Sequence, residues 1–495
     1  MTSRWITAGL IVALLNGCTV GPNYTRPDVT TPAAFRFALA EESGNANVAW
    51  WSQFGDKTLV SLIDQALANN WDLKLAAAQV DQAAAVMMRT NSQFAPQVGY
   101  GATAERARVS EIADPAAAGN NPTSALNPYV GAGWQLDLWG RIARESEAAR
   151  ANLVGAEEAR RGVVLTLVAA VATTYLQLRS LDAQIVVAQE AAQNYAEQVK
   201  LFDERFSYGQ ISDVTLNQMK AQYETAAALI PQIRLEIGRT ENALSLLTGT
   251  APRAIPRGRD FASIRMIGVP SGVPSDILAR RPDVAQAEQN LIAANANIGA
   301  AEALYFPRVS LTGQGGSTSN ALNSLLTKPA SEWSVAADLA GPIFNGGRIT
   351  GQVLVSKAQK EAAAAQYQQA ILNAFREVSD GLVGYSQSKA RLAAENRLVE
   401  AQATTARLAY LSFQEGAESY TTVLIAQNDL LSARLSAIQT RYDALASLVA
   451  IYAAMGGGWV GHAATKAPVP NSMRPDSPST TTLPRVEIHT PFGDQ

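Results

Sequence analysis

Two long segments without proline constrain this chain more than any other feature. Residues 141–206 and 348–413 contain no proline, and each segment is 66 residues long. Proline breaks a helix interior, so its absence over such a length favours an unbroken helix. At 1.5 Å per residue, a helix of this length would reach about 100 Å. No compact domain is that thick, so the sequence predicts an elongated molecule.

Both segments occupy equivalent places in an internal repeat. Three motif pairs share an offset of 207 residues: Gly140-Arg141-Ile142 with Gly347-Arg348-Ile349, Phe206-x-x-Gly209-x-x-Ser212 with Phe413-x-x-Gly416-x-x-Ser419, and Leu247-Thr248-Gly249 with Ala454-Met455-Gly456. A fourth pair, at 94–98 and 305–309, has an offset of 211. Three matches at one offset indicate a duplication. Each half is therefore predicted to run helix, strand, strand, long helix, helix.

Each long segment is predicted to fold back as a helical hairpin. Small apolar residues recur at three- and four-residue spacing, which is typical of a narrow coiled-coil seam: Val163, Leu167, Ala170, Thr174, Leu178, Leu181 and Ile185. Gly209 and Gly416 can adopt the left-handed C-cap conformation, and Ser212 and Ser419 can cap the returning helices. We expect those helices to span residues 212–247 and 419–455.

The strand segments have one apolar and one polar face. Within residues 129–139, one face carries Val130, Ala132, Trp134, Leu136 and Leu138, and the other carries Gly131, Gly133, Gln135 and Asp137. In the second half, Val335, Ala337 and Leu339 alternate with Ser334, Ala336 and Asp338. Residues 97–105 and 308–314 alternate more weakly. About ten residues with two unlike faces are typical of a transmembrane β-strand, and a half-exposed soluble sheet is the alternative.

The N-terminus has the pattern of a lipoprotein signal. Arg4 precedes the apolar run 6–15, which is too short to span a bilayer and is typical of a signal peptide. The run ends in Leu15-Asn16-Gly17-Cys18, which resembles a bacterial lipobox, and Cys18 is the only cysteine. In such signals the cysteine is lipidated. Thr19, rather than Asp, follows it, which resembles lipoproteins sent to the outer membrane. The alternative is a short apolar segment with a free thiol.

Composition excludes several classes of function. The formal net charge of -3 provides no basic face, so no nucleic-acid partner is expected. The only histidines, His462 and His489, lie beyond the last periodic segment, so the folded body contains neither a histidine base nor a histidine metal ligand. We also find no phosphate loop and no repeated metal-ligand cluster. We therefore predict that the chain is not an enzyme and has no metal and no cofactor besides the covalent lipid on Cys18.

These patterns divide the chain into six segments. We assign residues 1–17 to a signal peptide, 18–55 to a lipidated N-terminal segment, 56–249 to the first repeat, 250–274 to a linker, 275–458 to the second repeat and 459–495 to a disordered tail. The linker assignment depends on four prolines between Gly249 and Pro274. The tail is rich in proline, serine and threonine and has no periodicity.

Four predicted strands are too few to close a barrel around a lumen. An open sheet in lipid would leave its edge N–H and C=O groups unsatisfied, at several kcal/mol each. Several chains must therefore share one barrel if the strands lie in a membrane. Two chains would give an eight-stranded barrel filled by side chains, whereas three would give twelve strands and a channel. The strand number favours three or more chains.

The motifs together resemble one known family. The lipobox, the following Thr19-Val20-Gly21-Pro22-Asn23-Tyr24-x-Arg26-Pro27, the duplicated Gly-Arg-Ile and the Phe-x-x-Gly-x-x-Ser turns are similar to the TolC-type outer-membrane factors, within them the NodT-like or OprM-like lipoproteins. The resemblance implies a homotrimer with a twelve-stranded barrel and a periplasmic helical tunnel, an α+β membrane protein. It also implies a periplasmic adaptor (membrane fusion protein) and an inner-membrane pump, often of the resistance-nodulation-division (RND) type. The expected function is efflux of small toxic molecules across the outer membrane.

The resemblance also suggests a periplasmic gate after the second turn. Relatives often have Leu-Asp-Ala-Gln there, with the aspartate forming a charged ring, but here Ile425 precedes Ala426-Gln427. A gate of Thr421, Ile425 and Asp429 would therefore close by apolar contact and dewetting, with Asp429 supplying a displaced acidic ring. Ordinary helix packing for Ile425 and a solvated helix face for Asp429 are the alternatives.

Two further sets of residues are candidates for function. The hairpin turns would meet the adaptor through Tyr208, Gly209, Ser212, Glu415, Gly416 and Ser419, although capping alone also accounts for the glycines and serines. The polar faces of the strands would line the lumen through Gln135, Asp137, Thr312, Gln314, Ser334 and Asp338. This lining is polar rather than strongly charged, which suits varied cargo.

Two other functions remain open. The outer component of a type I protein secretion system would share this fold and gate. A lipid-anchored periplasmic adaptor or coiled-coil scaffold would instead have no membrane barrel and no heat-modifiable trimer in outer-membrane fractions.

Overall fold

The computed structural model describes residues 19–29, 31–32, 34–37, 49–113, 115, 119, 121–269, 280–456 and 459–474. The predicted signal peptide, Cys18 with its lipid, and the tail beyond residue 474 lie outside these described residues.

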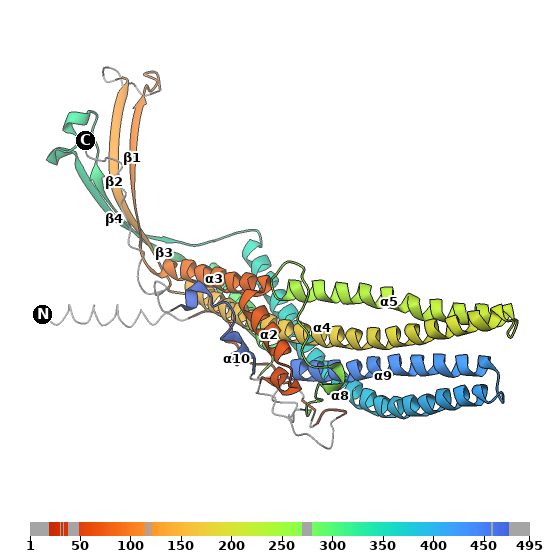
Figure 1. Ribbon diagram of the computed structural model, residues 1–495. Helices are drawn as coiled ribbons and strands as arrows, with labels where there is room; N and C mark the ends of the chain where they lie inside the picture. The colour runs from red at the N-terminus through yellow and green to blue at the C-terminus, as the bar shows by residue number, and fades with distance from the viewer. Residues whose placement is uncertain are drawn as a thin grey trace.

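The predicted order of elements is present in both halves (Figure 1). The first half contains α2 (Lys57–Asn69), α3 (Trp71–Asn91), β1 (Gln97–Ala107), β2 (Thr123–Leu136), α4 (Arg141–Ser207) and α5 (Asp213–Leu247). The second half contains α7 (Pro282–Glu302), β3 (Arg308–Ser317), β4 (Ser331–Ala340), α8 (Arg348–Gln414) and α9 (Tyr420–Ala454). The strands project from one end of the molecule, and two helical hairpins extend from the other.

The two long helices have nearly the predicted lengths. Helices α4 and α8 are each 67 residues, about 100 Å at 1.5 Å per residue. Helix α5 returns along α4, α9 returns along α8, and α4 packs against α9 (Figure 1). By hydropathy and length, α4 is the one described helix that could cross a membrane, but 44 % of its most apolar window is buried inside the protein, as in a core helix.

The predicted narrow seam is only part of the buried surface of α4. Leu167 and Leu178 are buried as predicted, but so are Val168, Ala172 and Leu176 on other sides of the helix. The reason is that α2, α3 and α7 pack around this half of α4 in addition to α5 and α9. This middle layer contains the main hydrophobic core, whereas a smaller cluster joins the hairpins near their far ends.

The four strands form one antiparallel sheet in the order β1-β2-β3-β4. Gln135 pairs with Ser310, and Ser310 pairs with Asp338. Strand β2 begins six residues before the predicted start at Tyr129, and it ends at Leu136 rather than Trp139. Strands β1 and β4 are the two edges, and each is paired on one side only within the described chain.

The segment predicted as a linker is packed against the body over its described residues, 250–269. Its apolar side chains Ile255, Phe261 and Ile264 are buried. Arg179 of α4 donates to the carbonyl of Arg259, at 3.1 Å from Nε and 2.9 Å from Nη2. On the other side, Arg441 of α9 donates to the carbonyls of three residues, Phe261, Ala262 and Ile264. This connecting segment therefore ties the first hairpin to the second.

The prediction that the whole tail is disordered is wrong for residues 459–474. These residues contain the short helix α10 (Trp459–Ala464), and Trp459 is fully buried. The Trp459 ring contacts Trp51 edge-on, with 5.4 Å between ring centroids. Asp81 of α3 accepts hydrogen bonds from the backbone N–H groups of Asn471 and Ser472. A buried tryptophan and these bonds offset the chain entropy that a Pro- and Ser-rich composition otherwise leaves uncompensated.

Candidate functional site

The sheet has one apolar and one polar face, and the register shows which residues share each. Directly paired residues of antiparallel strands point to the same side. The polar side carries Gln135, Thr312, Gln314, Ser334 and Asp338, five of the six residues predicted to line a lumen. The opposite side carries Val98, Tyr100, Val130, Trp134, Leu311, Trp333, Val335 and Leu339, all of which are exposed.

The exposed apolar face is large for a single chain in water. Trp333 is 81 % exposed and Val335 is 76 % exposed. Exposed apolar patches of this extent mark an interaction site, and a row along neighbouring strands matches the lipid-facing band of a barrel. The two unpaired sheet edges, on β1 and β4, carry free backbone donors and acceptors along their length.

The prediction that Asp137 lies on the polar face of a strand is wrong, because β2 ends at Leu136, one residue before it. Its Oδ2 accepts the backbone N–H of Ala143, in the first turn of α4, at 2.8 Å. A carboxylate there accepts from an N–H that has no partner within the helix, and its charge interacts favourably with the positive end of the helix dipole. The chain turns sharply at Gly140, which has φ of +74°. This turn takes Asp137 out of the alternation and makes it a cap.

The hairpin turns have the predicted backbone geometry. Gly209 and Gly416 have φ of +68° and +74°, the left-handed conformation that favours glycine. After each, the chain makes both bonds of a Schellman motif, for example Gln210 N–H to the carbonyl of Arg205 at 2.9 Å. Ser212 accepts the backbone N–H of Thr215 at 3.2 Å, as predicted. Ser419 holds the N-cap position of α9, but its side chain caps no backbone N–H, so its predicted capping bond is wrong.

The two turns lie side by side at the end of the molecule opposite the sheet (Figure 1). Three aromatic rings from different helices join the turns: Phe202 of α4, Phe413 of α8 and Tyr420 of α9. The ring centroid of Tyr420 lies 4.3 Å from that of Phe202 and 4.8 Å from that of Phe413. Tyr208 and Glu415, beside the glycines, are exposed. Burial, with smaller effects from Tyr195 and Tyr410, raises the pKa of Tyr420 far above its usual range, so its hydroxyl stays a donor, here to Gln198. Sequence reasoning missed this cluster because its members are far apart in the chain.

The three predicted gate residues lie on one exposed stripe of α9. Thr421, Ile425 and Asp429 are spaced by four residues, one helical turn apart, and all three are exposed. Ile425 is 59 % exposed although it is a large apolar residue. Ordinary packing within this chain therefore does not account for Ile425, since the buried side of α9 is formed by Val423, Leu424 and Ala426.

The motif after Cys18 forms a strap, residues 19–26, across the junction between sheet and helices. Val20 donates its backbone N–H to the carbonyl of Trp139 at 3.1 Å. Arg144 of α4 donates to the carbonyls of Val20 and Gly21, each at 3.2 Å, and to Asn23 Oδ1 at 2.9 Å. Asn295 of α7, which is fully buried, donates to the carbonyl of Pro22 at 2.9 Å. Most of these bonds use the strap backbone, and Asn23 contributes the one motif side chain among them.

Two glycines let the strap approach α7 closely. A Cβ added to Gly21 would overlap the backbone of Gly299, and one added to Gly299 would lie 2.9 Å from the side chain of Arg144. Further along the strap, Tyr24 donates to Glu288 at 3.1 Å, and Arg26 pairs with the same carboxylate. Burial and the Glu288 carboxylate raise the pKa of Tyr24 well above its ordinary value, so this hydroxyl remains a donor.

The described residues contain no grouping of three or more His, Cys, Asp or Glu that could hold a metal ion. The features described above are surfaces and turns, and they do not converge on a reacting centre.

Comparison with known proteins gives one consistent family. A family model described as outer membrane efflux protein matches residues 62–250 and 273–457. The toluene efflux pump outer membrane protein TtgI of Pseudomonas putida is 33 % identical over 454 residues, 90 % of this chain and 96 % of that protein. The cation efflux system protein CusC of Escherichia coli K12 is 32 % identical over 457 residues, 90 % of this chain and 98 % of that protein.

Solved structures agree on the fold. The crystal structure of the CmeC outer membrane channel of Campylobacter jejuni superposes with a TM-score of 0.85 at 24 % identity, over 91 % of this chain and 99 % of that one. At this identity the likeness concerns the fold alone. The predicted fold class, α+β with duplicated long hairpins and four strands per chain, is confirmed.

Proposed function

The chain belongs to the outer membrane efflux protein family, whose members are channels and not enzymes, and we propose that it is the exit duct of a tripartite efflux pump. In this role it conducts small toxic molecules passively from the periplasm to the exterior. The main structural support for this proposal is the sheet, which has two unlike faces. One face is apolar and exposed, the other is polar, and both edges are unpaired.

A trimer resolves these three features together. Strands β1 to β4 alternate in direction, so β4 of one copy would meet β1 of the next in antiparallel orientation. Three copies give twelve strands, the edges disappear, and every backbone group in the bilayer is paired. The apolar face then contacts lipid and the polar face, with Gln135 and Asp338, lines the lumen. Strands of 10 to 14 residues are long enough to cross when tilted.

We place the lipid anchor on Cys18, at the base of the barrel. Cys18 precedes by two residues the Val20 that is bonded to Trp139, where the sheet gives way to the helices. A lipid there would reach the periplasmic leaflet of the outer membrane, and several acyl chains would hold it stably. Mass spectrometry of the N-terminal peptide tests this placement, since an unmodified thiol would contradict it.

The gate is proposed at the far ends of the hairpins, on the exposed stripe of α9. Ile425→Ser should raise the single-channel conductance of the purified trimer several-fold, because a polar ring no longer expels water from the constriction. Leu408→Ser, which removes an exposed apolar side chain from α8, is the matched control and should leave conductance unchanged. Equal conductance in the wild type and Ile425→Ser would place the constriction elsewhere.

The paired turns are the proposed docking site for a periplasmic adaptor. Gly209→Glu should lower export at least tenfold while the trimer still forms, because no atom lies within 4 Å of the position that the new Cβ would occupy. Gly209→Ala introduces the same positive-φ strain, about 1 kcal/mol, without the charge, so it separates docking from folding. Crosslinking to the adaptor in cells reads out docking directly. A Gly209→Glu protein that fails to assemble would contradict a pure docking role.

The inner-membrane partner is proposed to be an RND-type pump, and growth of a deletion strain tests the whole proposal. We expect hypersensitivity to one class among drugs, detergents, organic acids, solvents and metal ions, restored by the gene. The relatives are named for toluene and for cations, which differ chemically, so the pump rather than the duct is expected to select the cargo. A normal phenotype with loss of one secreted protein would instead favour the type I secretion function.

A further inference from the structure

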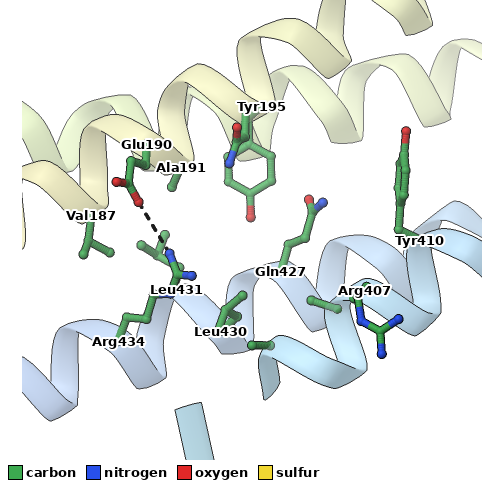
Figure 2. Close-up of a pocket in the computed structure, with 13 residues that line it drawn as sticks. Val187, Glu190, Ala191, Tyr195, Arg407, Tyr410, Gln427, Leu430, Leu431 and Arg434 are labelled. Atoms are coloured by element: carbon green, nitrogen blue, oxygen red, sulfur yellow. Dashed lines mark ion pairs between the residues drawn. The ribbon is translucent and has the colours of Figure 1, made fainter. Parts of the chain in front are cut away.

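A cavity of about 320 Å³ lies between the two hairpins, about two to four turns along α9 from its start (Figure 2). Helix α4 contributes one wall, and α8 and α9 contribute the other. Most of the surface is apolar, from side chains such as Ala191, Ala403, Leu430 and Leu431. The neutral polar groups of the lining include the amides of Asn194 and Gln427 and the phenol of Tyr195, and the last two face each other across the cavity (Figure 2).

Neither of these two facing groups has a partner within the described part of the chain. The Gln427 Oε1 is buried and unbonded, although its side chain rises from α9 toward Tyr195 (Figure 2). Tyr195 is only 3 % exposed, and no described group accepts from or donates to its hydroxyl. Burial raises its pKa, so it is a neutral donor and acceptor. A buried acceptor without a partner destabilises the protein, so a molecule that bonded Gln427 Oε1 would recover part of that free energy.

The charged side chains at the cavity favour a neutral ligand. Glu190 of α4 and Arg434 of α9 form an ion pair at 3.5 Å, so their charges balance each other at that end of the cavity. The guanidinium of Arg407 points away from the cavity (Figure 2). Tyr410 stands at the same end as Arg407 and presents an aromatic ring. Apart from Arg407 and the Glu190–Arg434 pair, the lining is uncharged and offers mainly dispersion contacts.

We propose that this cavity is a binding site for neutral aromatic molecules that carry a hydrogen-bond donor, of the phenol class. An apolar cavity of about 150 Å³ holds a benzene ring, so the volume here suits two fused rings or a substituted one. The ligand hydroxyl accepts from Tyr195, and a rotation of the Gln427 amide into the cavity brings Oε1 within reach of the ligand's proton. The ligand touches both hairpins at once, so its binding opposes their separation. The effect on hairpin separation rests on the proposed function as a gated duct, whereas the binding itself does not. Loss of one would therefore leave the other standing.

The test uses 2-naphthol as a fluorescent probe and the full-length trimer in lipid nanodiscs. Ala403→Phe fills the cavity and provides the baseline for partition into lipid, and Ala401→Phe, at an exposed position outside the cavity, is its matched control. We expect Ala403→Phe to abolish saturable binding and Ala401→Phe to retain it. Gln427→Leu should weaken 2-naphthol about tenfold, and Gln193→Leu, an exposed glutamine of α4, should not.

The probe has its own control, 2-methoxynaphthalene, which has the same rings without the donor. It should bind more weakly than 2-naphthol to the wild type and should be unaffected by Gln427→Leu. The proposal is overturned if the wild type shows no saturable binding above the Ala403→Phe baseline. It is also overturned if Gln427→Leu weakens both probes equally, because the acceptor would then not select the ligand.

Discussion

Val335→Arg is expected to abolish assembly in the outer membrane, whereas Ala336→Arg, one residue away, is expected to allow it. Val335 belongs to the apolar face of β4 and is 76 % exposed, and Ala336 belongs to the polar face. If the apolar face contacts lipid, an arginine near the bilayer centre costs about 2–4 kcal/mol per chain. The symmetric oligomer repeats that cost in every copy. An arginine at 336 would instead project into water.

The measurement is the fraction of protein that migrates as a heat-modifiable oligomer from outer-membrane fractions. We expect Val335→Arg to fall below one-tenth of the wild type and Ala336→Arg to remain close to it. The same residue type at adjacent positions controls for β-propensity and for total charge. Equal assembly of the two variants would show that this sheet does not face lipid, and a lipid-anchored periplasmic scaffold would then be the better function.

Asp56→Ala is expected to be the most destabilising single change in the periplasmic body. Asp56 is almost fully buried, and its carboxylate accepts from Thr58 N–H at 2.8 Å, Tyr175 OH at 2.9 Å and Arg259 N–H at 3.0 Å. It therefore caps α2 and fixes both α4 and the connecting segment. Removing it leaves these donors buried without an acceptor, at about 3–5 kcal/mol per chain. Burial and the bond to Asp56 raise the pKa of Tyr175, so the neutral phenol donates to Asp56 while its oxygen accepts the backbone N–H of Gly258 at 3.0 Å.

Asp260→Ala is the matched control, because Asp260 lies in the same connecting segment, is exposed and caps no helix through its side chain. The readout is the temperature at which the trimer loses its native mobility on heating. We expect a drop of many degrees for Asp56→Ala and less than 2 °C for Asp260→Ala, since exposed substitutions stay within about 0.5 kcal/mol. Similar temperatures for both would mean that the connecting segment is a passive linker after all.

Features that repeat along the chain could be predicted from the sequence. The proline-free segments became α4 and α8 within one residue, and Gly209 and Gly416 adopt the expected left-handed conformation. The alternation in β4 correctly separated Val335 from Asp338. Helix length, strand alternation and turn geometry depend on neighbours a few residues away, which is the range over which sequence patterns are informative.

Errors occurred where a turn of the chain or a contact between distant segments decides what a residue does. Asp137 continues the alternation of β2 in sequence, but its carboxylate caps α4 after the chain has turned. The tail has a disordered composition, yet Trp459 enters a cavity formed by residues near position 50. The contacts of Trp459 depend on residues about 400 positions away, whereas the Asp137 bond to Ala143 is local and was hidden only by the turn at Gly140.

The sequence by itself determined the duplicated hairpins and the two-faced strands. The tertiary structure alone decided how the strap, the connecting segment and residues 459–474 are held, and which polar groups remain unpaired between the hairpins. The physical reason is that periodic burial is encoded locally, whereas a hydrogen bond such as that from Arg144 to Gly21 depends on which surfaces meet. Gly21 and Gly299 show the limit: each is an ordinary glycine in sequence, and only their contact explains why a side chain is excluded from both.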